Sequence, residues 1–582
     1  MRLNEKIYDK IHACWLGKNI GGTLGGPYEG RTERLSLSGI PDIGGNGPLP
    51  NDDLDLQLLN LHTLEQRGLY VTANDFSEEW AEHVYFPYDE YGYALANIRR
   101  NMVPPLSGCY NNPFTDCMGS PIRSELWAAL SPGEPDIAAY YAYQDAMVDH
   151  AGGEGMYGEV FFAVLESFAF EENNPVVLIE RSLDYLPSEC RVYSAVNDTL
   201  EWYKQGVEYK DIRDKILEKY SNKNFTDAPQ NIAFTIVGLL YGKDFEDAML
   251  KTVNLGYDTD CTVATLGSIL GIIYGTAGIP LSWSKSVGDE IMISPEVRGF
   301  DYPKTITELT ERTVAVNRKL AVENKERFKF RYIDSFKQQN FFLPKGSGSS
   351  LDVSIICSDF CSVIPGRENT VTVMFENKSY EEWHFKVSVS DKKDGKEHEI
   401  KLSPGEKSSI DFMLIGKINK LMCAEYRLSV TRLHDGQIWK NYNIDFILPA
   451  ASKWNIDGKE KYCNGGFINF SSPGTHCAST TLELDTPRTV KLICAGTNPV
   501  KLSINDKKVL ESDIKNVYLP AFHRCPKPQQ TLVSLDAGRY RINIDVESTN
   551  EITKLMFLPV ASDKSETSGS NYYYVDCAIG AK

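Results

Sequence analysis

The chain has 582 residues, 42% of them apolar, and a formal net charge of −18. This length predicts several domains, roughly three or four, and the acidic charge argues against nucleic acid as a partner, because phosphate binding needs a basic surface. No apolar run reaches the ~20 residues of a membrane-spanning helix, and the first residues lack the apolar core of a signal peptide, so we expect a cytoplasmic protein. The 13 cysteines include no C-x-x-C pair, so reduced thiols are expected and structural zinc is not.

Residues 1–343 predict an all-α domain of orthogonally packed helices, because apolar residues recur there at helical spacing and strand-like alternation is scarce. The tracts with this spacing are Asn4–Leu24, Asp53–Gln66, Glu134–Val148, Gly158–Phe170, Ser194–Lys204, Tyr209–Lys219, Asn231–Leu240, Phe245–Leu255, Cys261–Tyr274 and Thr305–Asn324.

Residues 344–350 are rich in glycine and serine and predict a linker. Beyond it, alternation with period two predicts strands such as Val371–Phe375 and Phe385–Val389. We expect two all-β domains, a β-sandwich at 351–450 and a jelly roll at 451–582 that could bind carbohydrate. Strands expected in the second of these are Thr489–Cys494, Val500–Ile504 and Tyr540–Val546.

The first helical tract carries Gly17, Gly21 and Gly25 at intervals of four and leads to Glu29. This spacing predicts close packing against another helix. A dinucleotide-binding loop explains the glycines poorly, because no strand precedes them. Glu29 would add a carboxylate to any acidic pocket near the end of this helix.

Two acidic clusters, Asn51–Asp53 and Asp258–Asp260, each stand where a helical tract begins. Asp and Asn are ordinary capping residues at such positions, because they accept hydrogen bonds from free N–H groups and suit the helix dipole. The apolar, glycine-rich flanks argue that these carboxylates do not lie on a solvated face. If the fold joins the two clusters, their repulsion calls for cations, and oxygen ligands favour Mg²⁺.

A glycine-rich break separates two further helical tracts, and Asp149, His150 and Glu154 crowd around it. A lone histidine is more often a satisfied core residue than a catalyst. The two neighbouring carboxylates keep the catalytic interpretation open beside the structural one.

Several separated segments resemble the ADP-ribosylglycohydrolase family, in the family's own order. Gly17–Glu29 is similar to its G-x-x-x-G-D-A-L-G-A-P-x-E helix, and Asn51–Asp53 to its T/S-D-D segment. Met118–Arg123 and Asp145–His150 are similar to its M-R-I-A-P and D-A-x-x-T-H segments. The most specific match is Asn254–Ala264, which is similar to N-L-G-G-D-T-D-T/S-x-A. The resemblance covers the predicted helical domain and nothing beyond it.

The resemblance implies an all-α catalytic domain that hydrolyses a glycosidic bond with two Mg²⁺ ions, for which Mn²⁺ could substitute. The metal positions it implies are Asn51, Asp52, Asp53, Asp258, Asp260 and Cys261. The catalytic candidates are Glu29, Asp53, Asp149, His150 and Glu154. The substrate-binding candidates are Arg123, Gly152, Gly153, Tyr157 and Tyr257.

The chain departs from the family pattern at positions that touch this implied site. Cys261 stands where the family has Thr or Ser, and a thiol is a poor Mg²⁺ ligand, so Thr262, a backbone carbonyl or water would have to replace it. Asn51 keeps a carbonyl oxygen in place of a hydroxyl. Tyr257 replaces the usual second glycine, and residues 149–155 differ from the family's T-H-x-x-P segment, which changes the pocket beside the substrate.

Four functions are therefore open. The first is a Mg²⁺-dependent hydrolase of an ADP-ribosyl, ribosyl or related glycosyl substrate. The second is a glycoside hydrolase acting on a carbohydrate, with the β domains as sugar-binding or structural modules. Their sugar-binding candidates are Trp454, Tyr462 and Tyr572–Tyr574, unless these residues fill cores. The third is a metal-free glycosidase using two carboxylates such as Glu29 and Glu154. The fourth is a non-enzymatic protein that binds a sugar or nucleotide. In each case we expect a small-molecule or glycosylated ligand.

Overall fold

The computed structural model describes residues 3–39, 47–86, 88–328, 339–342, 351–357, 362–390, 397–419, 422–549, 551–561, 573–574 and 577–579. The chain forms two compact units. The first consists of Met1–Phe86 and Pro113–Asp334, and the second of Pro87–Asn112 and Ser335–Lys582. The expected linker at 344–350 lies outside the described residues, and the domain boundaries drawn from the sequence stay predictions.

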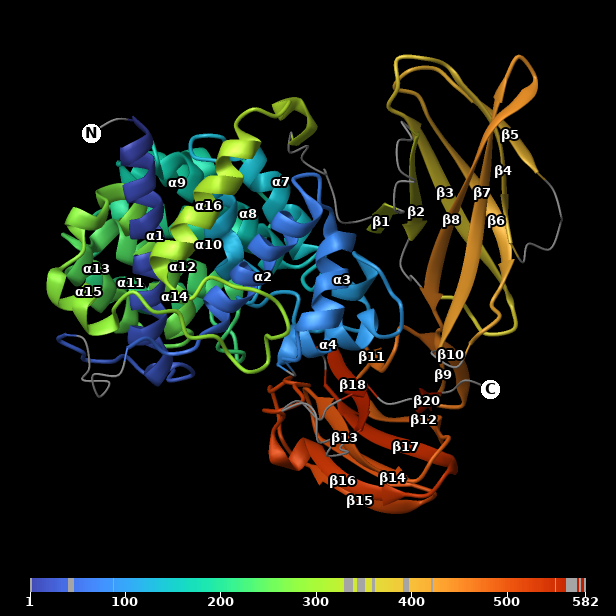
Figure 1. Cartoon of the computed structure of the whole chain (residues 1–582). Helices are drawn as coiled ribbons and strands as arrows, with labels where there is room; N and C mark the ends of the chain where they lie inside the picture. The colour runs from blue at the N-terminus through green and yellow to red at the C-terminus, as the bar shows by residue number, and fades with distance from the viewer. Residues whose placement is uncertain are drawn as a thin grey trace. The chain divides into compact units, whose positions relative to one another are not determined.

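The first unit is helical, and the expected order of a helical region followed by a β region is confirmed (Figure 1). Its helices are α1 (Leu3–Gly25), α2 (Asp52–Arg67), α3 (Ala73–His83), α6 (Ser124–Leu130), α7 (Pro135–Ala146), α8 (Glu154–Ala169), α9 (Pro175–Leu183), α10 (Arg191–Lys204), α11 (Tyr209–Tyr220), α12 (Ala228–Tyr241), α13 (Phe245–Val253), α14 (Thr259–Tyr274), α15 (Leu281–Val287) and α16 (Ile306–Leu320). Short 3₁₀ turns include η1 (Gly26–Tyr28) and η2 (Pro121–Arg123). None of the helices described is long and apolar enough to cross a membrane.

Every helical tract expected from the apolar spacing forms a helix. The spacing does not predict α3, α6, α9 and α15, which have 11, 7, 9 and 7 residues. Helices this short hold only two or three turns, so the apolar period repeats too few times to be recognised.

Helices α1 and α14 pack along each other through the glycines at intervals of four. A Cβ atom added to Gly21 would lie 2.3 Å from the carbonyl oxygen of Val263. One on Gly25 would lie 2.3 Å from that of Thr259, and Gly17 meets the α14 backbone equally closely. The predicted close packing is confirmed. It brings the C-terminal end of α1 beside the N-terminal end of α14, where the Thr259 hydroxyl donates to the Gly25 carbonyl at 2.8 Å.

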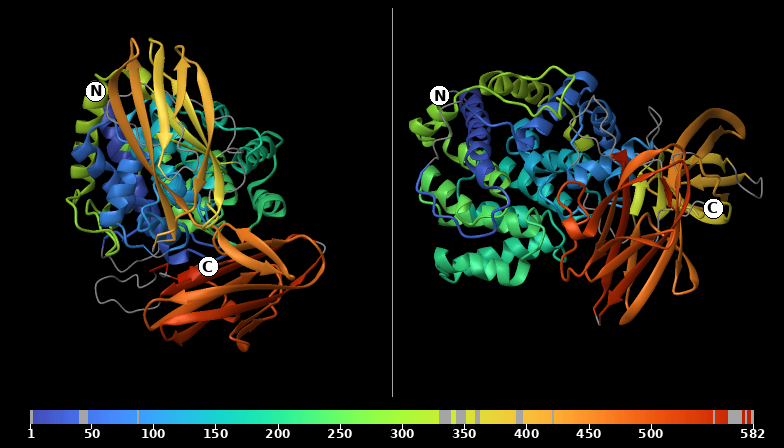
Figure 2. Two further views of the ribbon diagram at one scale, coloured as in Figure 1. Left: turned by 90° about the vertical axis from the view of Figure 1, so that its right-hand side faces the viewer. Right: turned by 90° about the horizontal axis from the view of Figure 1, so that it is seen from below.

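The second unit contains four antiparallel sheets, and the first two form a layered pair whose long yellow-to-orange strands are seen lengthwise in Figure 2. One sheet has the order β1 (Gln339–Phe342), β2 (Leu351–Cys357), β3 (Glu368–Asn377), β6 (Lys407–Ile415). The other has the order β5 (His398–Leu402), β4 (Trp383–Val389), β7 (Cys423–His434), β8 (Gln437–Pro449). Buried and half-buried residues alternate along β4, as expected for a strand with one face on a core.

A helical segment also belongs to this unit, which the sequence does not indicate. It contains α4 (Asp89–Ile98) and α5 (Leu106–Cys109). Met102, Leu106 and Tyr110 join the apolar core of the first sheet pair. Long-range packing, and not helical spacing, therefore assigns this segment to the β unit.

The remaining strands form the second pair of sheets. One has the order β10 (Lys459–Cys463), β9 (Ser452–Ile456), β12 (Gly474–Leu484), β17 (Gly538–Ser548), β14 (Val500–Ile504), β15 (Lys507–Ser512), with β20 (Cys577–Ile579) also on β12. The other has the order β11 (Phe467–Phe470), β18 (Thr553–Ala561), β13 (Arg488–Gly496), β16 (Gln530–Leu535), with β19 (Tyr573–Tyr574) also on β18. Trp454 is buried in the core of this pair, so this sugar-binding candidate fills a core, and Tyr572 lies outside the described residues.

We predict that Gly21→Ala destabilises the first unit by about 1–3 kcal/mol, because the new methyl group would meet backbone atoms that cannot move aside. Gly26→Ala is the matched control, since a Cβ atom there has only Leu49 Cδ1 nearby, at an ordinary 3.9 Å. Urea denaturation followed by circular dichroism measures both variants. Equal stability of Gly21→Ala and the wild type would contradict the close contact between α1 and α14.

Candidate active site

The two acidic clusters meet where α2 and α14 begin. One ligand atom each from Asp53, Asp260 and Cys261 lie within 4.8 Å of one another. The same holds for Glu29, Asp258 and Asp260. Because Asp260 belongs to both groups, the side chains form one continuous acidic cluster. The structure thus brings together five of the positions that the sequence singles out.

Helix capping explains one cluster but not the other. Asn51 caps α2, since its side-chain oxygen accepts a hydrogen bond from the Asp53 N–H at 2.8 Å. Asp258 occupies the capping position of α14, yet its side chain makes no capping hydrogen bond. Both Asp258 carboxylate oxygens, Oδ1 of Asp260 and Oδ2 of Asp53 are buried without a hydrogen-bond partner among the described residues.

Buried polar atoms without partners carry a large desolvation cost, which a cation bound to them would offset. Carboxylate oxygens are the ligands that Mg²⁺ and other hard divalent cations prefer, so this donor set fits the implied cofactor. Asp52 is half-buried, and its charge contributes to raising the pKa of Asp260. Asp52 belongs to neither group of ligand atoms within 4.8 Å, and its part in holding a metal stays a prediction.

The surroundings raise the pKa values of Asp258, Asp260 and Cys261. Burial and then the Glu29 charge raise the pKa of Asp258 and of Asp260 well above the usual range for aspartic acid. Burial, followed by the charges of Asp258 and Asp53, also raises the pKa of the Cys261 thiol. The thiol is therefore neutral at pH 7, and any cation at the aspartates would compete with protons for the same oxygens, so its binding would strengthen as pH rises.

Cys261, and not Thr262, faces the carboxylates. The Thr262 hydroxyl donates to the carbonyl oxygen of Thr259 at 3.2 Å within α14 and is wholly buried. The position where the family has a hydroxyl ligand therefore carries a neutral sulfur in this chain.

Lys18 neutralises one side of the cluster. Its ammonium group lies 3.1 Å from Asp53 Oδ1 and 2.8 Å from Glu125 Oε1, and it also donates to the Ile122 carbonyl at 2.9 Å. Burial lowers the pKa of Lys18, but the two carboxylates outweigh it and raise the pKa above the usual value, so the lysine is charged. Sequence analysis missed Lys18 and Glu125. The sequence feature that could have indicated Lys18 is its position as a charged residue in the middle of an apolar, glycine-spaced helical tract.

A pocket lies beside Asp53, between α1 and α2. Gly22 leaves room for the capping Asn51, because a Cβ atom at Gly22 would lie 2.5 Å from Asn51 Nδ2. The pocket is lined by Lys18, Asn19, Gly22, Leu49, Asn51, Asp53, Leu54 and Met292.

Arg123 and Asp149 belong to a second, wholly buried network. Two nitrogens of the Arg123 guanidinium donate to the two Asp149 oxygens at 2.9 and 2.8 Å, and Nε donates to Asp145 at 2.9 Å. His150 Nδ1 lies 3.0 Å from Asp149. Burial raises the pKa of Asp149, but Arg123 and His150 outweigh it and lower the pKa to about 2. These contacts give Arg123 and Asp149 a structural role, and their direct parts in binding and catalysis stay predictions.

The glycine-rich break near His150 is shaped by close contacts. A Cβ atom on Gly153 would lie 2.1 Å from the Thr115 carbonyl oxygen, and Gly152 has a φ of +81°. Both glycines are therefore required by the backbone, whether or not a substrate contacts them. The Glu154 carboxylate accepts hydrogen bonds from the N–H groups that begin α10, at 2.9 and 2.8 Å.

The two tyrosines among the substrate-binding candidates are half-buried. Tyr157 lies on the first turn of α8. Tyr257 has a φ of +68°, a conformation that accounts for glycine at this position in the family pattern. Its ring packs on Phe234 and under the Arg213 guanidinium. Their roles in binding substrate stay predictions.

We predict that Asp149→Asn destabilises the first unit by roughly 3–5 kcal/mol at neutral pH, because it leaves the buried Arg123 charge without its bidentate carboxylate partner. In the folded protein the pKa of Asp149 lies below the ordinary aspartate value of about 3.9. The contribution is therefore complete above about pH 4 and is lost as pH falls toward about 2.

Urea denaturation at a series of pH values measures this effect. Asp301→Asn is the control, since Asp301 pairs with Arg312 on the surface, where ion pairs contribute little. An Asp149→Asn effect that does not change with pH would contradict the assignment.

Comparisons with known proteins identify the N-terminal helical region of the chain. A model of the ADP-ribosylglycohydrolase family matches residues 3–321. An uncharacterized protein of Archaeoglobus fulgidus is 26% identical over 310 residues, which are 48% of this chain and 92% of that protein. Among solved structures, an ADP-ribosylglycohydrolase-related protein complex is 20% identical, covers 54% of this chain and 99% of that one, and has a TM-score of 0.37. An anti-sigma factor domain-containing protein is 12% identical, covers 43% of this chain and 95% of that one, and has a TM-score of 0.16.

Proposed function

Because the chain belongs to the ADP-ribosylglycohydrolase family, a family of glycosidic-bond hydrolases, we propose that it is a Mg²⁺-dependent hydrolase of an ADP-ribosyl, ribosyl or related glycosyl substrate. The observation that carries this proposal is the pair of overlapping ligand groups that share Asp260. Both Asp258 oxygens, Asp260 Oδ1 and Asp53 Oδ2 are buried without hydrogen-bond partners among the residues described, and this arrangement suits two hard cations side by side.

Asp52, Asp53, Asp258 and Asp260 would hold the ions. When bound, the ions would supply Lewis acidity and chelate neighbouring hydroxyls of a ribose-like sugar, so that its anomeric carbon is oriented for attack. Lys18 holds Oδ1 of Asp53 and leaves Oδ2 to face the cluster.

Glu29 is the best-placed general base. It follows η1 directly, its side chain is exposed, and one of its oxygens lies within 4.8 Å of Asp258 and Asp260 oxygens. A carboxylate in this position can reach both solvent and a sugar held at the cluster, and it would take a proton from the attacking water.

The metal-free alternative receives less support. A two-carboxylate glycosidase would use Glu154 as the partner of Glu29, but both Glu154 oxygens accept hydrogen bonds from the backbone of α10. Removing that carboxylate from the α10 N-terminus would leave two N–H groups without acceptors. Carbohydrate binding by the β domains stays a prediction.

The proposed activity is tested on the full chain with ADP-ribosyl-arginine, ADP-ribosyl-serine, nucleosides and aryl glycosides. We expect EDTA to abolish turnover and Mg²⁺ or Mn²⁺ to restore it. Asp258→Asn should lower kcat/KM by about 10³-fold or more, because it removes a ligand from the charge-stabilising site, whereas Asp301→Asn on the surface should not. Turnover that resists EDTA would contradict the proposal, and substrate binding without turnover on any compound would indicate a binding protein.

We further predict that Cys261→Ser tightens Mg²⁺ binding roughly tenfold, about 1.4 kcal/mol, because a hydroxyl oxygen replaces a neutral sulfur beside Asp53 and Asp260. Calorimetric titration with Mg²⁺ measures the affinity. Cys477→Ser, which changes an exposed thiol in the β unit, is the control. Unchanged or weaker Mg²⁺ binding by Cys261→Ser would show that this side chain does not face a cation.

A further inference from the structure

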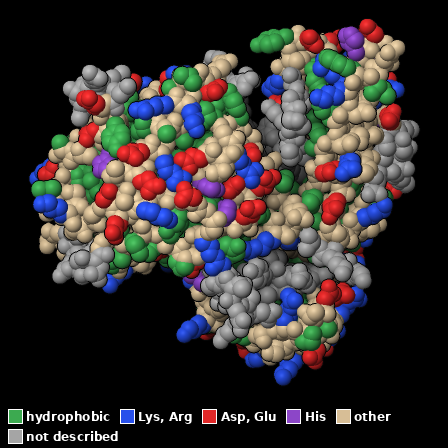
Figure 3. Space-filling model, viewed as in Figure 1, with side chains coloured by type: hydrophobic (Ala, Val, Ile, Leu, Met, Phe, Trp, Pro, Cys, Tyr) green, Lys and Arg blue, Asp and Glu red, His purple; other side chains and the backbone are tan. Residues whose placement is uncertain are grey.

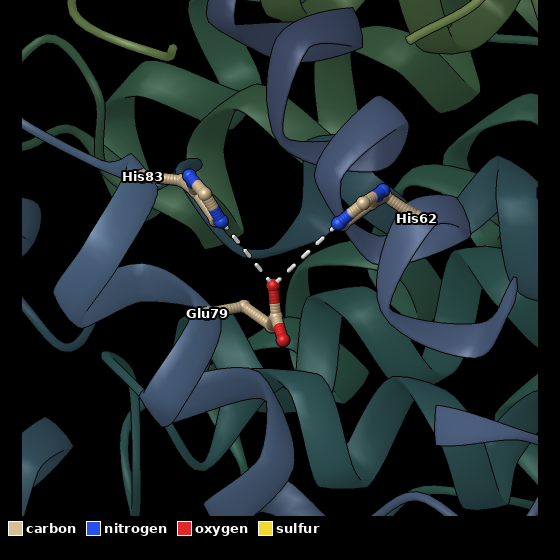
Figure 4. Close-up of side chains that lie close together, drawn as sticks. All are labelled: His62, Glu79 and His83. Carbon is tan, nitrogen blue, oxygen red and sulfur yellow. Dashed lines mark ion pairs between the residues drawn. The ribbon is translucent and has the colours of Figure 1, made fainter. Parts of the chain in front are cut away.

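A second group of metal-ligating side chains lies in the helical unit, on α2 and α3. His62 comes from α2, and Glu79 and His83 stand four residues apart on α3, so both α3 side chains project from one face toward α2. Figure 4 shows both imidazoles directed at the same Glu79 oxygen. Nε2 of His62 lies 3.9 Å and Nε2 of His83 lies 3.5 Å from Glu79 Oε2.

These separations are too long for hydrogen bonds, which join nitrogen and oxygen at about 2.7–3.2 Å. They are close to the spacing of ligand atoms around one ion. Bonds of about 2.0–2.1 Å in a tetrahedral site place neighbouring ligand atoms about 3.3–3.4 Å apart. All three ligand atoms lie within 4.8 Å of one another, so a small inward movement completes such a site.

The protonation of His83 leaves its inner nitrogen free to bind a metal. Its Nδ1 lies 3.0 Å from the carbonyl oxygen of Arg298, and a carbonyl can only accept, so Nδ1 carries the proton. In the neutral form of His83, the lone pair of Nε2 therefore points toward the Glu79 carboxylate. That arrangement is repulsive unless a metal ion or a proton lies between the two atoms. An outer hydrogen bond of this kind is typical of metal-bound histidine.

The surroundings hold the other ligands in place. Arg67 Nε donates to the second Glu79 oxygen at 2.8 Å, which fixes the carboxylate and leaves Oε2 to the histidines. The Phe300 ring packs on both imidazoles, with centroids 5.2 and 5.4 Å away. Burial lowers the pKa of His62, which favours the neutral form that binds metal.

The group is also accessible. The His62 and His83 side chains are each 13% exposed, so an ion can enter and keep a water ligand. In Figure 3, histidine atoms reach the surface of the helical unit among acidic and basic side chains.

We propose that His62, Glu79 and His83 bind one transition-metal ion, Zn²⁺ by preference, at a site separate from the acidic cluster. Two imidazoles and one carboxylate suit zinc and disfavour Mg²⁺, which demands oxygen ligands. The ion cross-links α2 to α3. The site uses no cysteine, which is why the absence of a C-x-x-C pair gives no indication of it.

The test is a zinc titration of the chelator-treated full chain against a chromophoric zinc chelator, in excess Mg²⁺. We expect one tightly bound equivalent in the wild type and in Asp260→Asn, and its loss in His62→Ala and His83→Ala. His434→Ala, which removes an exposed histidine of the β unit, is the matched control and should keep it. Retention by Asp260→Asn separates this result from any failure of the proposed hydrolase.

A second measurement uses only the wild-type protein and so does not require any variant to fold. X-ray absorption at the zinc edge of the wild-type protein, loaded with one equivalent, should show two imidazole ligands. Oxygen ligands alone would overturn the proposal, as would the absence of a tight equivalent or equal zinc binding by the wild type and a His62→Ala/His83→Ala double variant.

Discussion

The close contact between α1 and α14 is the constraint on which the acidic cluster depends. Helices usually pack with their axes about 8–10 Å apart, and here glycine on α1 lets the backbones approach without intervening side chains. This contact places Glu29, just beyond α1, beside the aspartates that open α14. The same helix carries Lys18 toward α2, where it meets Asp53. One packing contact thus determines how far apart the carboxylates of three segments lie.

The buried carboxylates in and near the site differ in whether a cationic side chain of the protein lies beside them. Lys18 forms ion pairs with Asp53 and Glu125, and Arg123 forms ion pairs with Asp145 and Asp149. Such pairs offset the desolvation of buried charge through short, well-aligned contacts. The carboxylates of α14 have no comparable cation among the ion pairs of the described residues. Of these carboxylates within the described residues, those of Asp258 and Asp260 lack a cationic partner, and they are the ones for which a ligand is proposed.

Local patterns predicted much of this arrangement. The glycine spacing identified the packed face of α1, and the order of acidic and glycine-rich segments identified the residues that assemble around Asp260. Long-range pairings could not be predicted in this way. Lys18 and Glu125 are 107 residues apart, and nothing in either neighbourhood indicates the other. For the same reason, local patterns could not predict that Tyr110 and its helical neighbours pack on a β core.

Helix α2 contributes a residue to each of the two proposed metal sites, and the two groups of ligands differ in chemistry. Asp53 opens the helix and His62 follows more than two turns later, about 13.5 Å along the axis at 1.5 Å per residue. No single ion can bridge that distance, so each group must satisfy its own ligands. At the helix N-terminus the donors are almost all carboxylate oxygens, which favours a hard cation. Toward the other end the donors are two imidazoles and one carboxylate, with His83 oriented by the Arg298 carbonyl and Glu79 by Arg67, and this set favours a softer ion. The ligand types, more than the number of charges, therefore decide which ion each end of α2 can hold.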